Sequence, residues 1–68
     1  MAREHRPAGW VIPRKNQRRA EINGAVYELH RDAYGWCRVF RDGDYMGYVK
    51  GYGNGYAYVA GLEERHHA

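Results

Sequence analysis

The sequence predicts an all-β domain, a small antiparallel meander of four to five short strands. Two dipeptides support this prediction, Asn23-Gly24 and Asp42-Gly43, and each lies between strand-like runs. Both are preferred in type I′ hairpin turns, whose two central residues need positive φ. The third observation is the number of aromatic residues, seven Tyr, two Trp and one Phe, because aromatic side chains favour strands. We expect the sheet to curl into an open barrel or to pair with a second copy, because a small sheet cannot bury all these rings on one face.

The first hairpin is predicted around Asn23-Gly24. A two-residue loop pairs Ile22 with Ala25 and Arg19 with Glu28, an opposite-charge pair that favours this register. A helix over residues 14–21 is the alternative, because Arg, Lys, Gln, Ala and Glu are good helix formers. No apolar stripe at helical spacing precedes Ile22, so a short strand is favoured.

The second hairpin is predicted over residues 35–50, around Asp42-Gly43. A two-residue loop places Phe40 opposite Tyr45, Val39 opposite Met46 and Trp36 opposite Val49. Because side chains alternate between the faces of a sheet, one face then carries Trp36, Phe40, Tyr45 and Val49, and the other Cys37, Val39, Met46 and Tyr48. We therefore expect Trp36 and Phe40 to be core residues.

The rest of the chain is expected to be less regular. Residues 1–9 are predicted to be a disordered basic arm, residues 10–61 a single β-domain and residues 62–68 a polar C-terminal tail. Trp10-Val11-Ile12 ends at Pro13, which indicates an edge strand or a tether that docks Trp10 on the sheet. Residues 51–55 contain three glycines and predict a loop, and residues 56–60 predict a last strand.

Charge is concentrated at the N-terminal end. Residues 1–19 contain six Lys and Arg against one Glu, a net charge of +5, whereas residues 20–68 contain five against seven acidic residues, a net charge of −2. A basic arm on a nearly neutral sheet is typical of proteins that contact phosphate backbones. A single Cys37 and the lack of a long apolar run favour a cytoplasmic protein with no membrane segment.

Catalytic and metal-binding patterns are weak. Gly51, Gly53 and Gly55 resemble part of a dinucleotide fingerprint, but that motif needs a following helix, where a strand is expected here. The adjacent His66 and His67 lack the spacing of a zinc site, and Cys37 is expected to be a buried small residue. We expect no enzyme activity, no cofactor and no metal.

Aromatic and basic residues alternate on neighbouring predicted strands, and this pattern predicts a nucleic-acid-binding β-domain, a regulatory or accessory factor. The arm would contact phosphates and a sheet face would contact bases, by stacking on a single strand or by entering a DNA groove. The alternative is a protein-interaction module or small inhibitor that docks through exposed rings or a free sheet edge, as a homodimer or with another protein. The candidate nucleic-acid-binding residues are Arg14, Lys15, Arg18, Arg19, Arg38, Lys50, Tyr48 and Tyr52.

The order of a turn, a Trp-containing strand, a Gly turn and a strand with a Gly-aromatic pair is similar to that of three-stranded sheets that read DNA. Such sheets carry a helix behind them, which this sequence is not expected to supply, and the pattern identifies no family.

Overall fold

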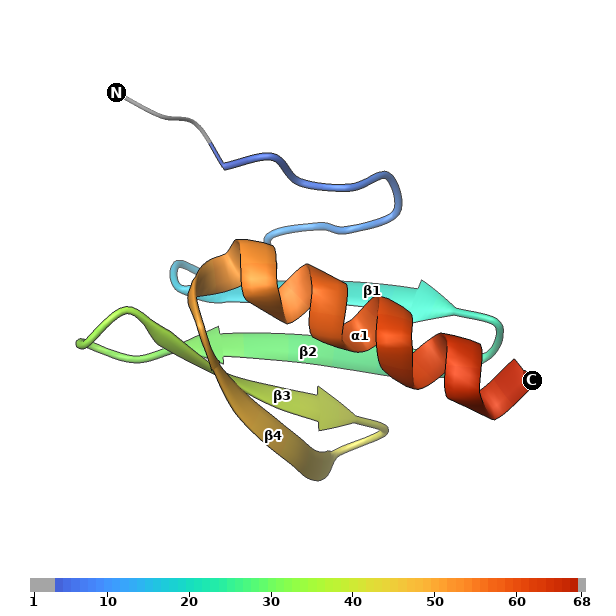
Figure 1. Ribbon diagram of the computed structural model, residues 1–68. Helices are drawn as coiled ribbons and strands as arrows, with labels where there is room; N and C mark the ends of the chain where they lie inside the picture. The colour runs from blue at the N-terminus through green and yellow to red at the C-terminus, as the bar shows by residue number, and fades with distance from the viewer. Residues whose placement is uncertain (1–3, 68) are drawn as a thin grey trace.

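Four antiparallel strands form one sheet, and a C-terminal helix covers one of its faces (Figure 1). The computed structural model describes residues 4–67. The elements follow one another as β1 (Gln17–Ile22), β2 (Ala25–Arg31), β3 (Trp36–Arg41), β4 (Asp44–Lys50) and α1 (Gly51–His67). The predicted meander is confirmed, and it is open, with β1 and β4 at opposite edges. The expectation of an all-β chain is confirmed in part, because the fold is mostly sheet but also contains the helix α1.

Both predicted hairpin turns are confirmed. Asn23 and Gly24 have φ values of 52° and 84°, and Asp42 and Gly43 have φ values of 50° and 85°, as type I′ turns require. The first hairpin has the predicted register, with Ile22 opposite Ala25. Residues 17–22 form a strand, so the preference for a strand over the alternative helix is confirmed.

The second hairpin follows its predicted register for two pairs only. Phe40 lies opposite Tyr45, but a bulge then shifts the pairing, so that Val39 lies opposite Gly47 and not Met46. One extra residue on a strand reverses the faces of all residues beyond it. Tyr48 therefore shares a face with Arg38, its partner across the strands.

The predicted burial of β3 is also reversed. Cys37 and Val39 are fully buried beneath α1, whereas Trp36 is 38% exposed and Phe40 is half-buried on the opposite face. The sequence predicts the largest apolar side chains of β3 in the core. Because α1 packs on the face that carries Cys37 and Val39, these smaller side chains are buried instead.

Residues 51–67 form α1 in place of the predicted loop, the predicted last strand and residues 62–67 of the predicted polar tail. The helix buries Tyr52, Tyr56, Val59 and Leu62, which recur every three or four residues. Gly55 allows close contact with the sheet, because a Cβ at this position would lie 2.8 Å from Leu29 Cδ1. A helix with several glycines has poor intrinsic propensity, so tertiary packing stabilises it.

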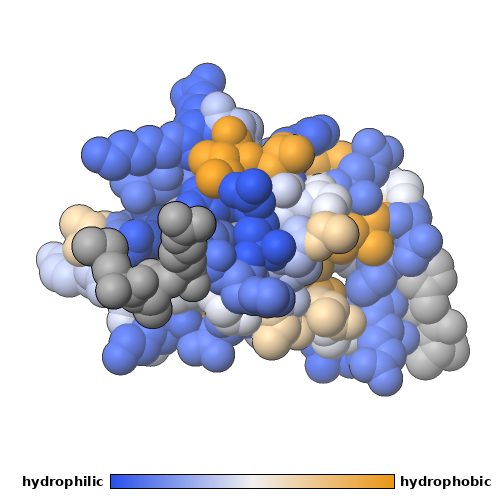
Figure 2. Space-filling model, turned by 90° about the horizontal axis from the view of Figure 1, so that it is seen from above, coloured by the Kyte–Doolittle hydropathy of each residue, from blue (hydrophilic) through white to orange (hydrophobic). Residues whose placement is uncertain are grey.

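The segment before β1 docks on the domain as predicted. Trp10 is buried, with its ring centroid 5.0 Å from that of Tyr56, and Val11 exchanges two backbone hydrogen bonds with Arg19. Residues 4–9 contain no helix or strand, and residues 1–3 of the predicted disordered arm lie outside the described residues. Val11 and Ile12 stay about half exposed, and apolar patches interrupt a largely hydrophilic surface on this side of the molecule (Figure 2).

Candidate functional site

The face of the sheet opposite α1, called the open face below, is covered by no described helix or strand (Figure 1). Strand pairing and alternation define its side chains, three from each strand. They are Gln17, Arg19, Glu21, Val26, Glu28, His30, Trp36, Arg38, Phe40, Tyr45, Tyr48 and Lys50.

Three planar groups pack together on the open face. The rings of Trp36 and Tyr48 are stacked, with centroids 5.3 Å apart and planes 23° apart. Arg38 Cζ lies 5.2 Å from the Tyr48 ring centroid. Tyr48 is 41% exposed, so this stack of Trp36, Tyr48 and Arg38 is accessible to a ligand.

Asp32, in the turn between β2 and β3, holds the stack in place. Its Oδ1 accepts hydrogen bonds from the backbone N–H groups of Tyr34 and Trp36, at 2.9 and 3.1 Å, and its Oδ2 accepts one from the Tyr48 hydroxyl. The Tyr48 hydrogen bond, followed by the backbone hydrogen bonds, holds the pKa of Asp32 below its usual value, and the same contact raises the pKa of Tyr48. At neutral pH, Asp32 is therefore ionised and Tyr48 is protonated.

A second ring cluster follows along the open face. Phe40 contacts His30 and Tyr45, with centroids 4.7 and 6.0 Å apart. His30 Nε2 lies 2.6 Å from a carboxylate oxygen of Glu28. Tyr45, at one side of this cluster, stays 59% exposed.

The two ends of the sheet differ in charge. The meander brings the turn before β1, the turn between β2 and β3 and the end of β4 to one end, which we call the basic end. Backbone hydrogen bonds join these segments, from Arg31 to Asn16 and from Gly51 to Gly35. The basic end exposes Arg14, Lys15, Arg31, Tyr34 and Lys50, whereas Glu21, Asp42, Asp44 and Glu63 lie toward the other end.

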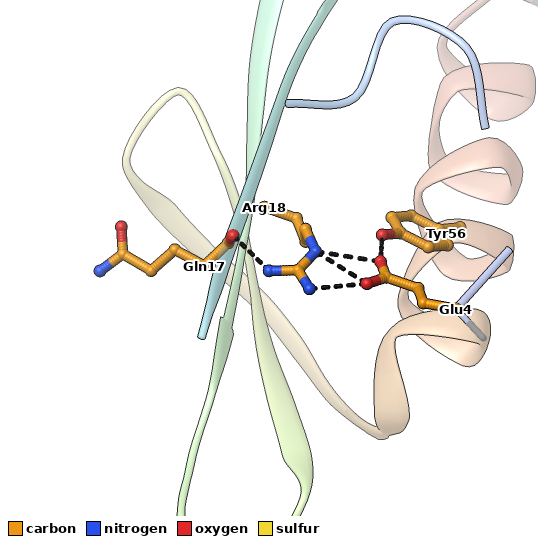
Figure 3. A network of polar contacts seen from close by, with 4 residues as sticks. All are labelled: Glu4, Gln17, Arg18 and Tyr56. Carbon is orange, nitrogen blue, oxygen red and sulfur yellow. Dashed lines mark hydrogen bonds and ion pairs between the residues drawn. The ribbon is translucent and has the colours of Figure 1, made fainter. Parts of the chain in front are cut away.

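Two predicted site residues, Arg18 and Tyr52, lie away from the open face, and Figure 3 shows the Arg18 side chain on the same side of the sheet as α1. The Arg18 guanidinium donates to both carboxylate oxygens of Glu4, at 2.6–3.1 Å, and Tyr56 donates its hydroxyl to the same carboxylate. Arg18 Cζ also lies 4.0 Å from the Tyr52 ring centroid, and the Arg18 side chain is only 12% exposed. The hydrogen bond to Glu4 raises the pKa of Arg18.

The other six predicted residues lie on or beside the open face. Arg19, Arg38, Tyr48 and Lys50 are on the open face, and Arg14 and Lys15 are in the adjoining turn at the basic end. The structure adds Asp32 and Tyr34, of which Tyr34 is 86% exposed. An Asp at the start of a turn commonly accepts backbone N–H groups, which signals part of the role of Asp32, but its contact with Tyr48 depends on the β-bulge.

The remaining chemical candidates are distant from this site. Cys37 is buried, and burial raises the pKa of its thiol, so the reactive thiolate is disfavoured. The glycines of residues 51–55 follow a strand and begin a helix, but the sheet is antiparallel and lacks the βαβ unit of a dinucleotide site. Within residues 4–67, no three His, Cys, Asp or Glu side chains are grouped as metal ligands. The one described helix is too short and too polar to cross a membrane.

Comparison with known proteins adds no relative: no protein-family model, no curated protein and no solved structure matches the chain.

Proposed function

We propose that this protein binds nucleic acid through the open face, with the basic end directed at phosphates. The observation that supports this most is the stack of Trp36, Tyr48 and Arg38, held by Asp32 on an uncovered sheet face. Groups that are fixed before binding lose little conformational entropy when a ligand arrives. An ordered array of rings and a guanidinium therefore suits a ligand that offers bases and phosphates together.

The cations support a moderate number of phosphate contacts. Arg19, Arg38 and Lys50 lie on the open face, and Arg14 and Lys15 lie beside it. Glu21 and Glu28 lie on the same face, so its charge is only weakly positive. We expect the slope of log affinity against log salt to be modest, at about 0.9 for each duplex phosphate contacted.

The helix α1 supports the same proposal indirectly. Sheets that contact nucleic acid with one face need a scaffold on the other, and α1 supplies it by burying Leu29, Val39 and Val59 together. A supported sheet keeps the spacing of its exposed side chains, which a free hairpin does not.

Binding to a labelled DNA duplex of about 20 base pairs, two helical turns, tests the proposal. The variant carries Arg14→Gln, Lys15→Gln and Arg19→Gln, and keeps Arg18 because Glu4 pairs with it. We expect weaker binding and a salt slope flatter by up to about three units. A matched pair, Lys50→Gln and Arg65→Gln, removes one exposed cation at the basic end or near the end of α1, and only Lys50→Gln should weaken binding.

Failure has two distinguishable forms. If the wild type binds neither duplex nor single strands at low salt, the proposal is wrong. If it binds but the triple variant behaves like the wild type, the basic end is not the phosphate contact.

The protein-interaction alternative has one observation in its favour. The outer edge of β4 has no strand neighbour among the described residues, and Tyr45 beside it is 59% exposed. Such an edge can accept a strand from another protein or from a second copy. A lysate pull-down with and without nuclease separates the two functions, because only a nucleic-acid-mediated capture is lost after nuclease treatment.

A further inference from the structure

We infer that the ligand is duplex DNA, and that the open face enters the major groove with Arg38 directed at the edge of a G·C pair. This inference rests on the proposed function and specifies its ligand.

The first step concerns the ring faces. Trp36 and Tyr48 stack on each other, Arg38 packs on Tyr48, and Phe40 contacts both His30 and Tyr45. Proteins that bind single strands need ring faces that are free to stack on bases. Here Trp36, Tyr48 and Phe40 each pack against another planar group, so they form a layer that supports Arg38 and has fewer free ring faces; Tyr34 and Tyr45 are the more exposed rings beside it.

The second step concerns width. The strands β2, β3 and β4 span two inter-strand spacings, which is about 10 Å. The major groove of B-DNA is about 12 Å wide and admits a two-stranded β-ribbon, so we expect β3 and one neighbouring strand to enter it while the outer strands lie toward the phosphate backbones. With β3 along the middle of the groove, β1 lies toward one phosphate backbone and carries Arg19, with Arg14 and Lys15 just before it.

The third step concerns Arg38 itself. It lies on β3 between His30 of β2 and Tyr48 of β4, so it is central in this three-stranded part of the face. Its side chain is 52% exposed, and its contact with Asp32 is long, at 3.9 Å. The guanidinium therefore keeps donors free, and paired donation from Arg to guanine O6 and N7 is the commonest specific contact in the major groove.

Three probes of the same mixed sequence test the groove: a DNA duplex of about 20 base pairs, the matching RNA duplex and one DNA strand alone. The A-form major groove of RNA is too deep and narrow for side chains to read. We expect the DNA duplex to bind at least about ten-fold more tightly than either other probe. Equal binding of both duplexes indicates phosphate contacts alone and overturns the inference. Tighter binding of the single strand also overturns it but leaves the proposed function intact, whereas binding to none of the probes removes both.

A matched pair of variants tests Arg38. Arg38→Gln and Lys50→Gln each remove one cation from the open face, and circular dichroism checks that both are folded. The wild type should prefer the mixed-sequence duplex over an alternating A·T duplex. We expect Arg38→Gln to reduce this preference about five-fold or more, and Lys50→Gln to weaken both probes equally. A wild type without preference, or an Arg38→Gln variant that keeps it, rules out the base contact.

Discussion

The two faces of the sheet both carry large apolar or aromatic side chains but meet different surroundings. On the covered face, Leu29, Cys37 and Val39 have no exposed surface. On the open face, Trp36 and Tyr48 are each about two-fifths exposed, although Trp36 is the largest side chain of β3. Burial in this protein therefore follows from where α1 packs and not from the size or hydrophobicity of individual strand residues.

Small residues explain why α1 packs on the covered face. Gly47 faces α1 there, and a Cβ at this position would lie 2.7 Å from the Tyr58 hydroxyl oxygen. Ala20 and Ala25 are buried on the same face. A helix approaches a sheet closely only where side chains leave room, and the large rings of the open face do not.

The largest expected effect is the difference in unfolding free energy between truncating a side chain on the covered face and truncating one on the open face. Leu29→Ala should lower the free energy of unfolding by about 2–5 kcal/mol, because it opens a cavity beneath α1. Phe40→Ala, on the half-buried open face, should lower it by about 1 kcal/mol, which is the scale of its ring contacts. Urea unfolding measures both. Equal losses would mean that a second copy or another protein covers the open face.

Helix packing on the covered face is tested by a matched pair of glycine substitutions. Gly55→Ala should reduce the free energy of unfolding by roughly 1 kcal/mol, since overpacking against Leu29 outweighs the gain in helix propensity. Gly61→Ala meets no atom within 4 Å and should stabilise the protein by up to about 1 kcal/mol. If both substitutions stabilise it, the covered face is less tightly packed than the structure indicates.

On the open face, the contribution of Asp32 should depend on pH. Its pKa is lower in the folded protein than in the unfolded chain, so its stabilising effect is present above the unfolded value of about 3.9 and is lost as pH falls through the folded value. Asp32→Asn should therefore lower the melting temperature near neutral pH, with a difference that shrinks below about pH 4. In the Asp32→Asn variant, tyrosine absorbance should also show a lower pKa for Tyr48 than in the wild type, because the contact with Asp32 raises it. A difference that is independent of pH would rule out the ionised contact.

The smallest expected effect comes from two hydroxyls near α1. The Tyr52 hydroxyl is buried and has no hydrogen-bond partner among the described residues. Tyr52→Phe should leave stability unchanged or raise it by up to about 1 kcal/mol, since a buried unpaired hydroxyl is costly. Tyr58→Phe is the matched control, because the Tyr58 hydroxyl donates to Met46 O at 2.7 Å, and it should lose about 1 kcal/mol. Destabilisation by Tyr52→Phe would reveal a bound water at that hydroxyl.

The sequence alone determines the local parts of this protein. Asn23-Gly24 and Asp42-Gly43 specify their turns, because both need positive φ at two positions and few residues adopt it readily. The first turn also fixes the register of its hairpin. Pro13 ends the short apolar segment of residues 10–12, which docks Trp10 on the domain. Arg14, Lys15, Arg19 and Arg38 lie where this local pattern predicts them, whereas Tyr48 and Lys50 reach the open face only through the bulge in β4.

Only the tertiary structure decides the rest. The bulge at Met46 reverses the faces beyond it, and α1 forms from a glycine-rich segment whose own propensity opposes a helix. Arg18 lies outside the open face because α1 covers the face of β1 that carries it, where Glu4, fourteen residues earlier, pairs with it. Each of these outcomes depends on contacts between residues distant in the sequence. Turn signals and periodicity report only on near neighbours, so they could not show which face α1 would cover.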